Sequence, residues 1–188
     1  FGVQKPASWT TPAVVPGAIA AGNVVALGTG KDIGVDVASL AEKVATDGYS
    51  VNGFASRPGL QWSLRGVRST DGVPIYGQLV GDNGGPGLYG YPLNEVENGS
   101  FDPTVAQLIA ADWRKFVVGV RQDITYDLFR EGVISDDTGK VIVNLMQQDS
   151  KALRVVFRVG YVGANPITAL NANDATRFPA GVLTPAAG

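Results

Sequence analysis

Cysteine and histidine are both absent from the 188-residue sequence. Without cysteine the chain can form no disulfide, no thiolate metal site and no cysteine nucleophile. Without histidine it lacks the base of Ser-His-Asp and Cys-His catalysis, the usual nitrogen ligand of zinc and the commonest general base near neutral pH. We therefore predict no catalytic residue, no metal site and no cofactor.

The sequence also has no large excess of positive or negative charge and few long apolar runs. The 15 lysines and arginines are dispersed and the formal net charge is -2, so no basic stripe follows a phosphate backbone. The longest apolar stretch near the start, residues 12–28, is interrupted by Pro12, Pro16, Gly17 and Gly22 and has no positive leader. We expect no sequence-specific binding of nucleic acid, and neither a signal peptide nor a membrane span in this stretch.

Glycine and proline are plentiful, at 25 and 11 residues, beside 45% hydrophobic residues. This composition is typical of a globular, loop-rich protein and not of a disordered one. A chain of this length buries roughly 70% of the surface that it exposes when unfolded. One domain with a sizeable core, or one domain with an extended end, is therefore expected.

The segment 36–48 predicts an amphipathic helix. Its apolar residues recur at i, i+3, i+4 and i+7, the spacing of one helix face: Val37, Leu40, Ala41 and Val44. Asp36 is the predicted N-cap, and Gly48 stands where a helix C-cap glycine belongs.

The segments around this helix predict short strands and turns. Residues 1–33 are punctuated by proline and glycine and carry one β-prone run at 23–27, so we expect extended segments and turns there. A short strand over 51–56 and a second helix from Ser56 to about Arg65 should follow. The pair Asp71-Gly72 predicts the tip of a turn.

Glycine is most concentrated between residues 78 and 100, where the sequence reads GDNGGPGLYGYP. No helix signal follows to supply free amides, so we predict a mobile loop and not a phosphate cradle. The predicted loop centres on Gly81, Asp82, Asn83, Gly84 and Gly85. A second fragment, GTGKD at 28–32, resembles the end of a P-loop, but Val25 stands where that motif needs glycine and Asp32 where it needs Ser or Thr.

Two later segments, 116–129 and 153–161, alternate with the two-residue period of a half-buried strand. The sequence between them, EGVISDDTGK, has turn residues at Asp136, Asp137 and Gly139. The two strands are therefore predicted to pair as a long antiparallel ribbon.

The charged residues of these strands fall on alternate positions, which a pleated strand places on one face: Arg121, Asp123, Asp127, Arg154 and Arg158. Asp123 and Asp127 are too loosely constrained to specify a glycosidase pair, and Asp136 and Asp137 lack the ligand spacing of an EF-hand loop. We predict that the charged face makes cross-strand or inter-subunit ion pairs. Such exposed pairs contribute about 0 to 1 kcal/mol each, so they specify partners more than they stabilise.

Four segments, taken in order, resemble one known family. They are GYSVNGFASRPGLQWSLRGVRSTDGVPIYG (48–77), LYGYPLNEV (88–96), LIAADWRKFVVGVRQDITYDLFRE (108–131) and ALRVVFRVGYVGANPITAL (152–170). The series is similar to the major capsid proteins of tailed bacteriophages with the Hong Kong 97-type shell fold. The similarity runs over roughly residues 34–170, which is most of the chain.

The resemblance implies an α+β fold. An α/β-like axial domain, with a central sheet and flanking helices, would take residues 34–130. Long antiparallel strands at 131–170 would return to a peripheral domain, with 1–33 as an extended segment of that domain and 171–188 as a C-terminal tail. The family's N-terminal arm, extended loop and spine helix have no counterpart here, and Phe1 stands where a start Met is expected. The chain is therefore expected to be the C-terminal portion of a longer subunit.

The function implied by the resemblance is structural and not enzymatic. Copies would assemble into the pentamers and hexamers of an icosahedral bacteriophage or prophage head that encloses the genome. Scaffolding and portal proteins are further candidate partners, contact with packaged DNA would be non-specific, and no membrane is involved. Assembly would take place in the bacterial host cytoplasm and the protein would reside in the virion, with the loop at 81–85 near a local symmetry axis.

Some members of this family weld their shells through an isopeptide bond that uses an asparagine near the last strand. Asp149 falls at the matching position, with Asn144 as the nearest upstream alternative. A carboxylate cannot supply the amide leaving group, so we expect no self-cross-linking.

Three alternatives stay open from the sequence. An encapsulin-like nanocompartment shell protein shares the fold. A carboxylate-using hydrolase would need converging acids such as Asp123 and Asp127 with perturbed pKa values. A monomeric binding module would need an exposed aromatic patch around Tyr89, Tyr91 and Trp113.

Overall fold

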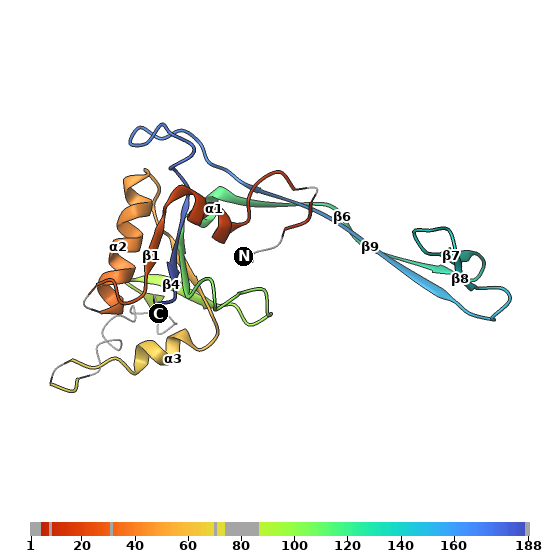
Figure 1. Cartoon of the computed structure of the whole chain (residues 1–188), viewed down its shortest axis with the longest axis horizontal. Helices are drawn as coiled ribbons and strands as arrows, with labels where there is room; N and C mark the ends of the chain where they lie inside the picture. The colour runs from red at the N-terminus through yellow and green to blue at the C-terminus, as the bar shows by residue number, and fades with distance from the viewer. Residues whose placement is uncertain (1–4, 8, 31, 70, 74–86, 187–188) are drawn as a thin grey trace. The chain divides into compact units, whose positions relative to one another are not determined.

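The computed structural model describes residues 5–7, 9–30, 32–69, 71–73 and 87–186. The chain divides into two units, one formed by residues 1–117 with 162–188 and the other by residues 118–161 (Figure 1). These boundaries differ from the predicted division at residues 130 and 170. The loop predicted at Gly81, Asp82, Asn83, Gly84 and Gly85 lies outside the described residues.

The first unit contains a six-stranded mixed sheet in the order β1-β10-β5-β2-β4-β3. The strands are β1 (Val24–Ala26), β2 (Gly53–Ser56), β3 (Gly87–Leu88), β4 (Tyr91–Glu95), β5 (Leu108–Ala111) and β10 (Ala180–Thr184). β1 runs parallel to β10 and β2 parallel to β4, while the other neighbours are antiparallel. The combination of this sheet with helices agrees with the predicted α+β class.

The helices of the first unit are α1 (Val14–Ala21), α2 (Ile33–Thr46) and α3 (Leu60–Arg65). α2 packs against β1, β5 and β10. Its predicted apolar face is confirmed, since Val37, Leu40 and Val44 are buried. Gly181 of β10 lies under this face, and a Cβ atom there would lie 2.8 Å from Cδ1 of Leu40, so glycine permits the close approach of helix and strand.

The N-terminus of α2 differs from the prediction. The N-cap is Asp32, whose carboxylate accepts a hydrogen bond of 3.0 Å from the Val35 N–H. Asp36, predicted as the cap, is instead buried in the first turn and accepts from the amides of Gly28 and Gly30 at 2.7 and 2.6 Å. The turn after β1 therefore folds back onto the start of the helix.

The extended structure predicted for residues 1–33 is wrong over α1. Pro16 occupies the first turn of this helix, where its missing N–H has no intrahelical partner to lose. Gly17 allows Phe178 to pack against the helix, because a Cβ atom at residue 17 would lie 2.4 Å from Cζ of Phe178. Pro16 and Gly17, which the sequence suggests are helix breakers, therefore fit this short helix.

Three other expectations need correction. α3 begins at Leu60, after Gly59 in the left-handed conformation, and Ser56 is the buried last residue of β2 and not a helix cap. Within residues 78–100, β3 and β4 form a hairpin. The expected tail contains β10, which pairs with both β1 and β5 in the sheet.

The long strands are confirmed at close to their predicted bounds. β6 (Phe116–Phe129) and β9 (Ala152–Gly163) pair as a two-stranded sheet, and we call this pair the ribbon. Between them, β7 (Val133–Ser135) and β8 (Val141–Asn144) form a hairpin. Its turn is organised by Asp136, whose carboxylate accepts from the N–H groups of Thr138 and Lys140, both at 2.9 Å.

Candidate functional site

The ribbon exposes most of its large apolar side chains. Tyr126 is 66% exposed, and Val118 and Leu153 are each 62% exposed. The other exposed large apolar residues of β6 and β9 are Val117, Val120, Ile124, Leu128, Phe129, Val155, Phe157 and Val162. Sequence periodicity predicted a half-buried ribbon, but in this chain alone the apolar face is uncovered. Apolar surface of this extent on a protein is typical of an interaction site.

The second unit has almost no hydrophobic core of its own. Residues 118–161 are all described, and Leu145 is the one buried hydrophobic residue among them. An isolated two-stranded sheet is at best marginally stable in water, because it cannot bury enough apolar surface. The second unit therefore has little buried apolar surface with which to stabilise the ribbon.

The charged residues that were predicted to share one face of the ribbon are exposed in the structure. Arg121, Asp123, Asp127, Arg154 and Arg158 are all exposed. Among the described residues, no ion pair within 4.0 Å joins any two of these five, so the predicted cross-strand pairs do not form within the chain. The prediction that these charges contact another subunit stays a prediction.

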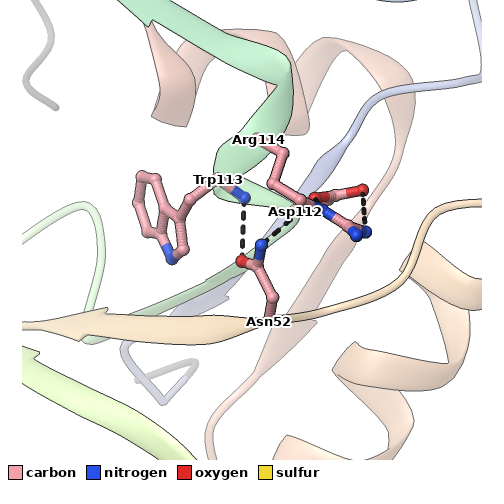
Figure 2. Close-up of polar contacts among 4 residues, drawn as sticks. All are labelled: Asn52, Asp112, Trp113 and Arg114. Carbon is pink, nitrogen blue, oxygen red and sulfur yellow. Dashed lines mark hydrogen bonds and ion pairs between the residues drawn. The ribbon is translucent and has the colours of Figure 1, made fainter.

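The chain enters β6 through a polar cluster in the first unit, shown in Figure 2. Asp112 follows β5 and is buried, and Arg114 binds it through two hydrogen bonds of 2.8 and 3.0 Å. Asn52 donates to the same carboxylate at 3.3 Å and accepts the Trp113 N–H at 2.9 Å. These bonds fix the short 3-10 helix η2 (Trp113–Lys115) at the point where the ribbon begins.

Aromatic packing supports the same junction. The Phe116 ring lies 5.8 Å from that of Trp113 and 6.0 Å from that of Phe178, between ring centroids. The Trp113 indole lies over Gly53, where a Cβ atom would come within 3.1 Å of it. Ala164, just after β9, donates its N–H to the Lys115 carbonyl at 2.7 Å. The start of β6 and the residue after β9 are therefore joined.

The Asp112 carboxyl has a lowered pKa. The main cause is the hydrogen bond from the Arg114 guanidinium, which favours the ionised form, while burial of Asp112 acts in the opposite direction. Since the pKa in the folded state is lower than in the unfolded chain, ionised Asp112 contributes stability above the unfolded value. That contribution is lost as the pH falls through the folded pKa.

We expect the Asp112→Asn variant to lose about 1 to 3 kcal/mol of folding free energy at pH 7, because it loses charge-assisted hydrogen bonds to Arg114. The difference from wild type should narrow as the pH falls below the unfolded value of about 4, because the unfolded chain then takes up a proton at residue 112 and the ionised carboxyl stabilises the folded state less. Urea denaturation at pH 7 and pH 3 measures both quantities. Asp137→Asn, in an exposed turn, is the control and should change stability by less than about 0.5 kcal/mol at pH 7. An equal difference at both pH values would contradict this account.

The structure also describes residues on which the alternative functions depend. Within the described part of the chain, no group of three or more acidic side chains could hold a metal ion. Tyr89 and Tyr91 are 43% and 45% exposed, but the hydroxyl of Tyr89 donates to the Gly34 carbonyl and Tyr91 packs edge-on to Phe54. Asp149 has a left-handed backbone, with φ of 46°, in the turn after β8.

One buried polar group was missed by the sequence analysis. Arg177 is 1% exposed and is hydrogen-bonded to Asn165 and Asn171, and Asp47 is buried beside Asn171. An arginine in a segment rich in Asn and Ala is ordinarily an exposed residue. The sequence carries no local signal for this group, because the acid of the group, Asp47, lies 124 positions from Asn171.

No helix among the described residues is long and apolar enough to span a membrane. No family model matches the sequence, and no curated protein matches it. Solved structures from bacteriophages do match.

A chain from Microbacterium phage Oxtober96 is 40% identical with a TM-score of 0.81, and the match covers 98% of this chain and 58% of that one. A chain from Mycobacterium phage Cain is 33% identical with a TM-score of 0.78, over 98% of this chain and 58% of that one. For a chain from Mycobacterium phage Adephagia the values are 31% and 0.79, over 100% and 59%. The chain thus spans less than two thirds of the length of these phage proteins and shares their fold.

Proposed function

We propose that the chain is part of a structural subunit of a bacteriophage head, with the Hong Kong 97-type shell fold. The observation that carries this proposal is the ribbon, which exposes apolar side chains along β6 and β9 and has one buried hydrophobic residue, Leu145, in its unit. A surface of this kind serves association and not the binding of a small substrate. The structural similarity to chains of Microbacterium and Mycobacterium phages supports a role in a phage.

A closed shell fits the chemistry of the ribbon. In a symmetric assembly each contact is repeated by every copy, so contacts that are weak singly add up over the particle. The charged face would make the contact between copies specific. A wrong register would bring like charges together, since Arg154 and Arg158 are positive and Asp123 and Asp127 are negative. The role is structural and not catalytic. The partners are further copies of the same subunit in pentamers and hexamers, and the location is the virion.

The test is to express the complete open reading frame that contains this chain and to examine the product by size-exclusion chromatography and negative-stain electron microscopy. We expect closed particles of uniform size with icosahedral symmetry. A product that stays monomeric at all accessible concentrations, with no particle in the micrographs, would overturn the proposal.

A further inference from the structure

Asparagine is followed by glycine at three places in the sequence, residues 52–53, 83–84 and 98–99. Every other asparagine precedes a residue that carries a side chain. The side-chain amide of an asparagine can be attacked by the backbone nitrogen of the next residue, and glycine hinders this attack least because it has no Cβ atom. The pair at 83–84 lies outside the described residues, so the structure allows the other two pairs to be compared.

Asn98 and Gly99 lie in the segment between β4 and β5, and both residues are exposed. Neither the Gly99 N–H nor the side-chain nitrogen of Asn98 forms a hydrogen bond to another described residue. The attacking nitrogen and the leaving nitrogen of such a reaction are therefore both open to water.

Ser100 holds the side-chain oxygen of Asn98 with two donors. The Ser100 backbone nitrogen lies 3.1 Å from Oδ1 of Asn98, and the Ser100 hydroxyl oxygen lies 2.7 Å from the same atom. Negative charge develops on this oxygen when a nitrogen attacks the carbon that bears it. Two donors at these distances are the arrangement that stabilises an oxyanion. Ser100 therefore favours attack at Asn98.

Asn52 provides a comparison within the chain, because it also precedes a glycine. Its side chain donates to the Asp112 carboxylate at 3.3 Å and accepts the Trp113 N–H at 2.9 Å. Gly53 is buried in β2, where a Cβ atom would lie 3.1 Å from the Trp113 side chain. The reaction at this pair would remove the nitrogen that bonds to Asp112 and would need access to a buried backbone group. The folded chain thus protects Asn52.

We propose that Asn98 is a site of spontaneous covalent modification, in which the Gly99 nitrogen closes a succinimide ring with the Asn98 side chain while Ser100 stabilises the oxyanion. A bond forms between the Gly99 nitrogen and Cγ of Asn98, and the bond from Cγ to the amide nitrogen breaks. The Gly99 nitrogen loses its proton to hydroxide, and the leaving nitrogen takes up a proton and departs as ammonia. Water then opens the ring and leaves an aspartyl or isoaspartyl residue at position 98, with no oxidation or reduction.

The modification changes both the charge and the backbone of this segment. It adds a negative charge beside Glu97, which is exposed. In the isoaspartyl form the main chain passes through the side-chain carbon, so the connection between β4 and β5 is lengthened. Asn98 lies outside the helices and strands of the described residues, and the fold should therefore accept either product.

Peptide mapping by mass spectrometry tests the site in the complete protein, incubated without denaturant at pH 9. We expect the peptide that contains Asn98 to gain about 1 Da, because the amide NH2 is replaced by OH, and to be labelled by isoaspartate-specific methylation. The peptide that contains Asn52 should stay unchanged in the folded protein. In urea, where the fold no longer protects either pair, Asn52 and Asn98 should be converted at similar rates.

Two variants identify the groups that take part in the reaction. Asn98→Gln should abolish the mass gain, because its longer side chain would have to close a larger ring. Ser100→Ala removes the hydroxyl donor and keeps the backbone donor, so conversion should slow by about 2- to 10-fold, less than at a buried oxyanion site because Ser100 is exposed. The matched control, Ser135→Ala, changes an exposed serine of β7 and should leave the rate unchanged.

The outcomes that would contradict the proposal are distinct. Equal conversion of Asn98 and Asn52 in the folded protein, or no conversion of Asn98 before urea is added, would overturn the site. A Ser100→Ala variant that reacts as fast as Ser135→Ala would overturn the part assigned to Ser100. Particle formation tests the proposed function separately, because the reaction at Asn98 does not depend on assembly.

Discussion

The Arg177→Met variant is expected to lose about 3 to 5 kcal/mol of folding free energy, a large part of the total stability of an ordinary domain. The side chain is 1% exposed and donates to three acceptors, the Asn165 side chain and the carbonyls of Asn165 and Asn171. Methionine fills similar space but donates to none of them. The Asn165 carbonyl would lose this donor in a poorly hydrated site, while the Asn165 side chain would keep the Tyr49 hydroxyl and the Asn171 carbonyl would keep Thr168. The loop between β9 and β10 would lose the guanidinium that joins its two ends.

Two further variants make this result specific. Arg177→Lys keeps the charge but has no planar fork, so it should recover part of the stability and not all of it. Arg130→Met changes an exposed arginine after β6 and should alter stability by less than about 0.5 kcal/mol. Urea denaturation of the three variants gives the comparison. If Arg177→Met were as stable as Arg130→Met, the hydrogen bonds of Arg177 would have no structural role.

Strong periodicity explains which elements could be predicted from the sequence. The ribbon strands and the buried face of α2 follow periods of two and 3.6 residues over eight to fourteen positions, and both were found in the structure. Weak local signals explain the errors. Asp32 and Asp36 are both plausible caps, and only the amides of Gly28 and Gly30 show that Asp36 is needed inside the turn.

Long-range contacts explain what the sequence could not reveal. Asp47 meets Asn171 across 124 positions, and Tyr49 meets Asn165 across 116, so neither pairing leaves a pattern within a local window. Helix α1 can pack at its position because Gly17 leaves room for the ring of Phe178, a residue far away in the sequence. The segment 166–170 depends on the same distant contacts, and the sequence patterns placed it at the end of the long strands.

The ribbon shows a different limit. An alternating pattern predicts that the apolar face of a strand is buried. It does not predict whether that face is buried by the same chain or by another molecule. In the structure the large apolar side chains of that face are exposed on both strands, for example Val118 on β6 and Phe157 on β9. The sequence therefore predicted the strands correctly and the burial incorrectly, and the difference is itself the signal for association.

The Ile124→Lys variant of the complete protein should abolish particle formation while leaving the subunit folded. Ile124 is 48% exposed in the middle of β6, so the subunit loses little packing when the side chain is replaced. In an assembly the same position would be covered by a neighbouring surface, and a lysine there would bury an unpaired charge. Because every subunit carries the substitution, the penalty is repeated at each equivalent contact of the particle.

Electron microscopy and circular dichroism together distinguish the two effects of this substitution. The expected result is native-like circular dichroism and thermal unfolding with no closed particles, and Phe157→Lys on β9 should behave in the same way, since Phe157 is 50% exposed. Ile124→Val keeps the apolar character and should form particles as wild type does. Particles of normal size from both lysine variants would mean that the apolar face is not an assembly surface. The ribbon would then need a different covering partner, because two strands with one buried hydrophobic residue, Leu145, in their unit are at best marginally stable alone.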